Sequence, residues 1–256
     1  MKKIIVANWK MNPDTPREAK VLMAATRVTA KSLKKTNVVL CPPALYLPLF
    51  KPSPKVELGS QDIATQLRGA YTGSIAAPMI KYSGATYTII GHSERRHPGV
   101  AGQAGDTDEI VNQKVKLALN QGLRVILCVG ERVRDEHGAY LTELRTSLEK
   151  SIGRLPRSVA SKLIIAYEPV WAIGVDATGT DTPAGFLEQA IFIRKVLSHW
   201  CGRAEAMKLP ILYGGSVNPK NALGFIVEGQ ADGLLVGRES LAPDHWREIM
   251  RIVDHA

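Results

Sequence analysis

Three side chains of this sequence have the chemistry needed to move a proton next to a carbonyl group. Glu168 can act as a base, His92 can donate a hydrogen bond to an oxygen, and Lys10 can supply a fixed positive charge. A carboxylate can remove a carbon-bound proton while an imidazole and an ammonium stabilise the oxygen charge that develops as an enediolate forms. These residues predict a proton transfer without a cofactor or a metal.

Each of these residues also has an ordinary explanation when it is taken alone. Lys10 could be a surface lysine, His92 a hydrogen-bonded structural imidazole, and Glu168 an anion at the start of a helix. Their shared position favours function, because each lies at the end of a short apolar run. Asn8 lies at the end of the same run as Lys10.

A second set of residues is suited to holding an anion. The run Gly214-Gly215-Ser216 and the residue Gly237 each end a further apolar run. Glycines let backbone N–H groups approach an anion that side chains would keep away. A generic tight turn is the alternative explanation, but barrels often bind phosphate after their seventh and eighth strands. A phosphate site is therefore predicted here.

The elements that must position these residues recur along the whole chain. Eight β-branched apolar runs predict strands at Ile4 to Lys10, Val38 to Pro43, Val56 to Gln61, Tyr87 to His92, Val125 to Glu131, Leu163 to Pro169, Ile211 to Ser216 and Gly233 to Arg238. Their mean spacing of about 33 residues is the size of one strand-helix-strand unit. We expect residues 1–256 to form one α/β domain, an eightfold (β/α)8 barrel. An open doubly wound sheet is the fallback.

Helical periodicity between the runs supports parallel strands with helices outside them. Helices are expected at Thr15 to Leu33, Asp106 to Gln121, Thr182 to Trp200 and Pro219 to Glu228. Asp106 and Thr182 are the expected N-caps, and Pro183 occupies the first helical position, where its missing N–H costs nothing.

Composition limits the possible partners. The chain has 45% hydrophobic and 22% charged residues, and 33 Lys and Arg against 24 Asp and Glu give a net charge of +9. This charge favours anionic partners, but it is scattered. The densest cluster, Lys31, Lys34 and Lys35, is interpreted as a solvated face at a helix end. We expect a small phosphorylated substrate, and neither nucleic acid nor membrane as partner.

The three cysteines are few and widely spaced. Cys41, Cys128 and Cys201 form no C-x-x-C pair, which argues against a disulfide framework and a zinc site. Cys128 is expected to be a packed thiol. The apolar stretch at the start of the sequence is too short for the core of a signal peptide. A reducing, cytoplasmic location is expected.

Seven motifs resemble the triosephosphate isomerase family along almost the full chain. They are ANWKMN (Ala7 to Asn12), GAYTG (Gly69 to Gly73), IIGHSERR (Ile89 to Arg96), CVGE (Cys128 to Glu131), AYEPVWAIG (Ala166 to Gly174), YGGSV (Tyr213 to Val217) and LLVG (Leu234 to Gly237). The resemblance implies a single-domain TIM barrel that interconverts dihydroxyacetone phosphate and glyceraldehyde 3-phosphate without a cofactor.

The resemblance also implies a role for each residue. Glu168 would shuttle the proton, His92 would be the neutral electrophile, Lys10 would supply charge, Asn8 a polar contact, and Glu94 would orient Lys10. The substrate phosphate would meet the backbone of Gly174, Ser216, Gly237 and Arg238, with Gly215 allowing its approach.

Two larger features are implied as well. A lid resembling Val170 to Gly179 would close over the substrate and exclude water. In a homodimer, Thr72 of the GAYTG loop would lie beside the partner's lysine equivalent to Lys10. The alternative for this loop is an isolated surface turn.

The sequence departs from the family pattern near the site. The lid segment Val175 to Asp181 is longer and lacks the usual Gly-Lys, and the connection His97 to Asp106 is longer, with Asp106 in place of a glutamate. Gly237 is followed by Arg238 instead of a second glycine. We expect the Arg238 side chain to point outward and pair with a carboxylate.

These departures keep alternative functions open. The altered lid and Arg238 could fit a four-carbon ketose phosphate, such as a tetrulose phosphate, handled by the same chemistry. A non-catalytic phosphosugar-binding barrel is a second alternative, but it would have no use for Glu168, His92 and Lys10 together.

Overall fold

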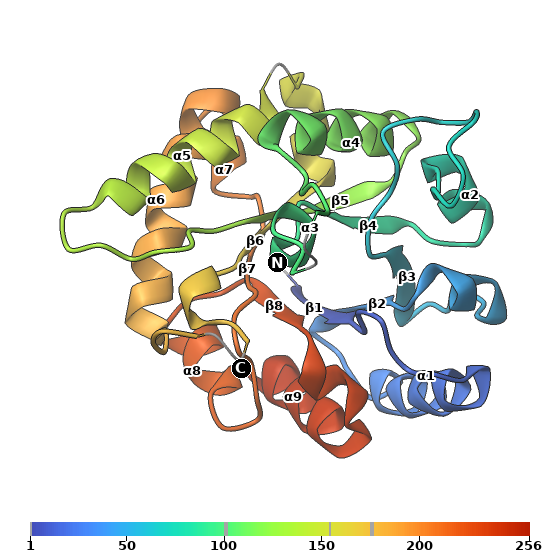
Figure 1. Ribbon diagram of the computed structural model, residues 1–256. Helices are drawn as coiled ribbons and strands as arrows, with labels where there is room; N and C mark the ends of the chain where they lie inside the picture. Colours follow the sequence, from blue (N-terminus) through green and yellow to red (C-terminus); the bar gives the residue numbers. More distant parts are fainter. Residues whose placement is uncertain (1, 100–101, 154, 175–176) are drawn as a thin grey trace.

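The strands of the computed structural model close into one parallel barrel (Figure 1). The structure describes residues 2–99, 102–153, 155–174 and 177–256. The strands are β1 (Lys3–Asn8), β2 (Thr36–Cys41), β3 (Val56–Ser60), β4 (Tyr87–Ile90), β5 (Arg124–Val129), β6 (Leu163–Tyr167), β7 (Ile211–Tyr213) and β8 (Gly233–Val236). Each pairs in parallel with its neighbours in chain order, and β8 closes on β1. The eightfold barrel is confirmed, and the open sheet is wrong.

Both faces of the strands are buried, as their continuous apolar sequences require. Along β1, Ile4 and Val6 join a cluster made only of strand residues, which fills the barrel. Ile5 and Ala7 alternate with them and pack in the larger cluster shared with the helices. Two layers of apolar contact therefore fix the strand register, and with it the positions of the strand ends.

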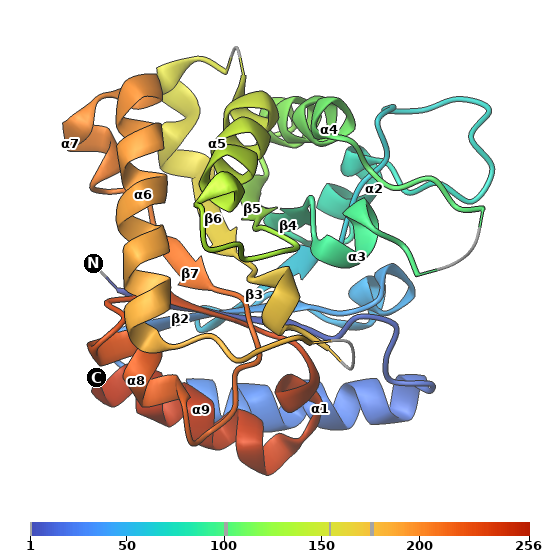
Figure 2. The same ribbon diagram turned by 60° about the vertical axis from the view of Figure 1, so that its left-hand side comes forward.

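The helices form an outer ring around the barrel (Figures 1 and 2). In chain order they are α1 (Pro16–Ala30), η1 (Ala44–Leu49), α2 (Ala77–Tyr82), α3 (Ser93–Arg96), α4 (Asp108–Asn120), α5 (Ala139–Ile152), η2 (Arg157–Lys162), η3 (Val170–Ala172), α6 (Pro183–Cys201), α7 (Arg203–Ala206), α8 (Ala222–Val227), η4 (Arg238–Leu241) and α9 (Pro243–His255). Thr182 caps α6 by accepting a hydrogen bond from the Gly185 N–H, with Pro183 following it, as predicted.

The structure corrects several expected boundaries. All eight strands end one to three residues earlier than expected, so Lys10, His92 and Glu168 lie in the turns that follow their strands. The expected helix from Pro219 starts only at Ala222, and the expected helix to Leu33 ends at Ala30. The polar residues that follow the strands therefore lie outside the regular strand backbone.

Asp106 is not the N-cap of α4. Thr107 caps this helix by accepting a hydrogen bond from the Ile110 N–H. The Asp106 carboxylate lies 2.5 Å from the Lys114 ammonium, which also lies 2.7 Å from Asp62. A buried lysine needs such partners, and this requirement outweighs the capping preference of Asp106.

Candidate active site

The residues expected to carry chemistry gather around one hollow at the carboxyl ends of the strands. This hollow has a volume of about 450 Å³ and an open mouth. Its lining includes every predicted catalytic and phosphate-binding residue: Asn8, Lys10, His92, Glu94, Glu168, Gly174, Gly215, Ser216, Gly237 and Arg238. Residues from the first, fourth, sixth, seventh and eighth strand ends therefore meet at one site.

The Glu168 carboxylate is buried and held by two donors. Its Oε1 lies 3.1 Å from Nε2 of His92, and its Oε2 accepts a hydrogen bond from the Ser93 N–H at 2.8 Å. The Glu168 backbone N–H donates to Val129, which anchors the turn after β6. The carboxylate is thereby placed at the mouth of the barrel beside the seventh strand end, where a Cβ at Gly214 would lie 3.1 Å from Cγ of Glu168.

His92 is oriented by the helix that follows it. Its Nδ1 accepts a hydrogen bond from the Glu94 N–H at 3.2 Å, within the first turn of α3. An Nδ1 that accepts carries no hydrogen, so the ring hydrogen is on Nε2 and points at Glu168. The same Nε2–H can donate to a substrate oxygen in the hollow.

Lys10 is held by contacts on both its side chain and its backbone. Its ammonium forms an ion pair with Glu94 at 2.5 Å. Its backbone has a φ of 53°, and Asn8 stabilises this turn by accepting the Lys10 N–H at 3.0 Å. Gln61 donates to the Lys10 carbonyl at 2.8 Å. Asn8 thus shapes the turn that places the ammonium.

The glycines that line the hollow bring backbone close to neighbouring side chains. A Cβ at Gly215 would overlap the Tyr213 hydroxyl, and a Cβ at Gly237 would lie 3.4 Å from Cε of Lys10. Gly174 adopts a φ of 82°, which favours glycine. Glycine is therefore required at Gly215, and Gly237 brings the end of β8 against Lys10.

Arg238 lacks the ion pair that the sequence predicted for it. It begins η4 with Gly237 as the N-cap, is exposed, and lines the hollow. It forms no ion pair with any carboxylate in the described part of the chain, so the expected partner is missing there. Arg238 lines the hollow together with Gly215, Ser216 and Gly237.

A cluster of buried polar groups holds the start of the expected lid. Glu131 accepts hydrogen bonds from the Tyr167 hydroxyl at 2.7 Å and from the Trp171 indole at 2.9 Å. Burial raises the pKa of Glu131, and these donors oppose the rise. The Thr178 N–H donates to the Trp171 carbonyl at 2.8 Å, which ties the two arms of the segment together. Val175 and Asp176 lie outside the described residues.

Cys128 is buried beside Glu168. Burial and the neighbouring Glu168 carboxylate raise the pKa of its thiol well above its usual value. A thiol with a raised pKa is a poor nucleophile. The expectation of a packed thiol agrees with this environment.

Thr72 lies away from this hollow. It is exposed in a long loop between β3 and α2, which extends from the barrel in Figure 2. A second hollow of about 680 Å³ lies beside the first, and Lys10, Gln61 and Glu94 contribute to its wall. The loop and this hollow therefore lie near the catalytic residues without filling their site.

Sequence reasoning missed two contributors, Ser93 and Gln61. Ser93 acts through its backbone N–H, which leaves no signal in residue type. Gln61 follows β3 directly and is the polar residue at the third strand end, so the rule used for the other strand ends could have found it.

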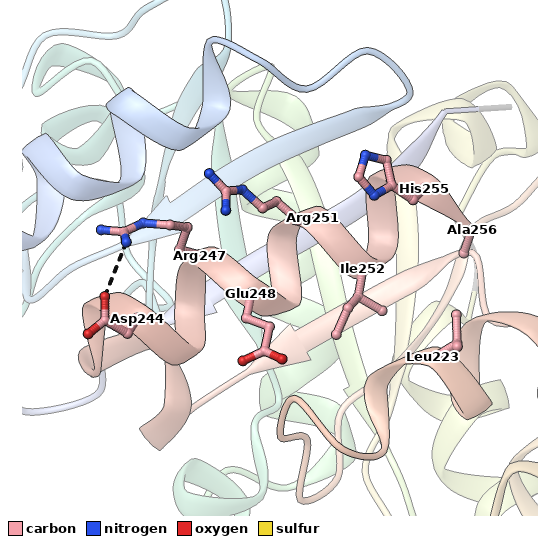
Figure 3. A pocket seen from close by; sticks show the side chains of 8 residues that line it. All are labelled: Leu223, Asp244, Arg247, Glu248, Arg251, Ile252, His255 and Ala256. Atoms are coloured by element: carbon pink, nitrogen blue, oxygen red, sulfur yellow. Dashed lines mark ion pairs between the residues drawn. The ribbon is translucent and has the colours of Figure 1, made fainter.

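Another hollow, of about 570 Å³, lies on the outside between α8 and α9 (Figure 3). Its charged groups include Arg247 and Asp244, which pair at 3.2 Å. The strand ends contribute nothing to its lining. It therefore has no part in the site at the carboxyl ends.

Fold and site together define an enzyme class. The parallel eightfold barrel gathers a carboxylate, an imidazole, an ammonium and several glycines in one hollow at its carboxyl ends, which is the arrangement of a TIM-barrel isomerase that acts on a phosphorylated substrate.

The comparison with known proteins agrees and is more specific. The family model described as triosephosphate isomerase matches residues 3–253, so the chain belongs to the triosephosphate isomerase family. It interconverts dihydroxyacetone phosphate and glyceraldehyde 3-phosphate.

Three relatives named triosephosphate isomerase illustrate the match. One from Thermus thermophilus is 41% identical, covering 98% of this chain and 99% of that protein. One from Dehalococcoides mccartyi is 40% identical over 98% of this chain and 96% of its own length. One from Aquifex aeolicus is 38% identical over 98% of this chain and 99% of its own length.

Proposed function

We propose that Glu168, His92 and Lys10 carry out the isomerisation. The substrate oxygens accept hydrogen bonds from Nε2 of His92 and from the Lys10 ammonium. The His92 hydrogen bond to Glu168 is then exchanged for one to substrate, which frees the carboxylate to remove a proton from one carbon and return it to the next. The supporting observation is the 3.1 Å separation of Glu168 and His92 in the hollow that Lys10 shares.

The phosphate group occupies the glycine-lined side in this proposal. In this arrangement the phosphate accepts hydrogen bonds from the backbone N–H groups of Gly174, Ser216, Gly237 and Arg238, which all line the hollow, and the start of η4 adds its dipole. The Val170 to Gly179 segment closes over the substrate and excludes water. Water exclusion strengthens the electrostatic contacts and protects the enediolate.

The proposal includes a homodimer. Exposed apolar side chains lie on the face that carries the Thr72 loop, among them Met11, which is 93% exposed, Leu45, which is 87% exposed, and Ile75. Burial of such a surface by a second copy would stabilise the association. In this arrangement Thr72 of one copy enters the 680 Å³ hollow of the other, beside Lys10. Sedimentation equilibrium of the purified chain tests the stoichiometry.

We further propose that residues 1–256 act as one domain in the cytoplasm. The barrel uses strands from Lys3 to Val236, and α9 packs back against α1. Among the described residues, none of the helices is long and apolar enough to cross a membrane. The three free cysteines agree with a reducing compartment.

A coupled isomerase assay in both directions tests the proposed function. We expect rapid turnover of both triose phosphates and a large loss of rate with the unphosphorylated triose. Turnover of a four-carbon ketose phosphate at a comparable rate would move the substrate assignment to the larger sugar. Failure of the chain to exceed its own Glu168→Gln variant would contradict the assigned base.

A further inference from the structure

The fold gathers the excess positive charge of the sequence at one end. The described connections that lead into the eight strands carry 12 of the 33 Lys and Arg but only three of the 24 Asp and Glu, when each is counted from the end of α1, η1, α2, α4, α5, α6 or α8 through the first strand residue, with the short helices η2 and α7 included. The remaining sequence has 21 of each. A charge that is scattered along the chain is therefore concentrated at the amino ends of the strands.

Three neighbouring connections at this end carry a group of lysines, which we name the lysine patch. It consists of six exposed lysines on the connections into β1, β2 and β3: Lys2, Lys31, Lys34, Lys35, Lys51 and Lys55. The three connections are joined directly. The Lys3 N–H donates to Lys35, the Lys55 ammonium donates to Leu33 at 2.7 Å, and the Arg27 guanidinium contacts the Lys51 carbonyl.

Carboxylates near the patch are already engaged. Asp254 of α9 accepts the backbone N–H groups of Lys34 and Lys35 at 2.7–3.0 Å, so it does not pair with their ammonium groups. Glu57 of β3 accepts from the Thr86 and Tyr87 hydroxyls at 3.2 Å. Within the described residues, none of the six lysines forms an ion pair.

The lysine patch cannot serve the catalytic site. The N-terminus and C-terminus lie on one side of the barrel in Figure 2, and α3, which follows His92, lies on the opposite side. Substrate enters at the carboxyl ends of the strands. The charge is therefore in the wrong place to attract a small phosphorylated sugar into the hollow.

Residue type narrows the ligand. The patch contains lysines, which act as point charges toward phosphate, and no exposed aromatic side chain among its described connecting residues 31–35 and 50–55, where Phe50 is buried. Without an aromatic surface, bases cannot stack on the patch. This pattern fits contact with a phosphate backbone and no reading of bases.

We propose that the lysine patch binds the phosphate backbone of duplex nucleic acid without sequence preference, in contrast to the expectation from the sequence of no nucleic-acid partner. Binding at this face leaves the active site open, so the bound protein retains its isomerase activity. The contact is electrostatic and weakens steeply with salt.

Fluorescence anisotropy with a labelled DNA duplex of about 20 base pairs tests this, at salt concentrations from about 25 to about 200 mM. If the patch contacts about five phosphates, the logarithm of the association constant falls against the logarithm of salt with a slope of about −4 to −5. The triple variant Lys31→Glu, Lys34→Glu, Lys35→Glu should weaken binding at least about tenfold. Its isomerase turnover should equal that of the parent chain, which shows that it folds.

The matched control reverses three exposed charges on α1 and α5, away from the connections of the patch, in Arg17→Glu, Lys20→Glu, Arg145→Glu. Retained duplex binding by this control supports the patch. Equal weakening by both triple variants would mean that net charge alone is responsible and would overturn the proposal. It would also be overturned by absence of binding at the lowest salt, or by sedimentation with anionic lipid vesicles without duplex binding.

Discussion

Lys114 lies 2.7 Å from Asp62 and 2.5 Å from Asp106 near the carboxyl ends of the strands, whereas Lys34 near the amino ends is exposed and has no ion pair within the described residues. Two further ion pairs lie near the carboxyl ends, between Lys10 and Glu94 and between Arg96 and Asp108. Charges at the carboxyl end hold each other in fixed positions, as catalysis requires. At the amino end, Arg194 pairs with Asp232 and Lys208 with Glu205, but the six lysines of the lysine patch have no ion pair within the described residues.

The largest effect is expected at Glu168, at the carboxyl ends of the strands. Glu168→Gln keeps the shape of the side chain and removes its ability to accept a proton. Turnover should fall by roughly two to four orders of magnitude. Steady-state kinetics measures this, with thermal unfolding as the control for folding. A turnover close to that of the parent chain would contradict the assignment of Glu168.

Replacing Lys114 tests whether the paired charges also stabilise the fold. Lys114→Met should lower the free energy of unfolding by about 3–5 kcal/mol, because Asp62 and Asp106 are left without their buried partner. Denaturant unfolding measures the loss. Lys114→Arg keeps a cation and should recover part of it. A loss below about 1 kcal/mol would show that solvent already serves these carboxylates.

A smaller effect is expected at Asp181, the residue before the cap of α6. Burial raises the pKa of Asp181 from 3.8 to about 6, and one carboxylate oxygen has no hydrogen-bond partner in the described structure. The folded state then holds this proton more tightly than the unfolded chain. The contribution of Asp181 to the free energy of unfolding is therefore fully present below pH 4 and is lost as pH rises through about 6.

Asp181→Asn should therefore match the parent near pH 4 and exceed its unfolding free energy by about 2 kcal/mol at pH 7. Unfolding across this pH range measures the difference. Asp135 is the matched control, because N–H groups of Tyr140 and Ala139 lower its pKa. Asp135→Asn should change stability in the opposite direction. If the difference in unfolding free energy between Asp181→Asn and the parent does not change between pH 4 and pH 7, the titration of Asp181 in this range is ruled out.

The smallest effect is expected at the amino end. Lys34→Ala should change the free energy of unfolding by less than about 0.5 kcal/mol, since an exposed, unpaired side chain loses little on removal. The same unfolding experiment that tests Lys114 measures it. A loss comparable with that of Lys114→Met would remove the distinction between the two ends.

The sequence was sufficient for the barrel and for most of the site, because eight apolar runs carry the strand signal and each functional residue follows one of them. The strands predicted from the sequence were too long, because Lys10 and Glu168 directly follow apolar runs in the sequence but lie in the turns after β1 and β6. The sequence assigned the cap of α4 to Asp106 because local preference cannot reveal that Lys114 requires that carboxylate. The backbone donor of Ser93 and the gathering of lysines from separate connections appear only in three dimensions.

The arrangement of Glu168, His92 and Lys10 around one substrate is tested most directly by a crystal structure with a small phosphorylated carboxylate that imitates the enediolate. We predict that its phosphate accepts the backbone N–H groups of Ser216, Gly237 and Arg238, and that its carboxylate end contacts His92, Lys10 and the released Glu168 side chain. A phosphate bound elsewhere, or a Glu168 carboxylate that stays on the Ser93 N–H and out of contact with the ligand, would contradict the account.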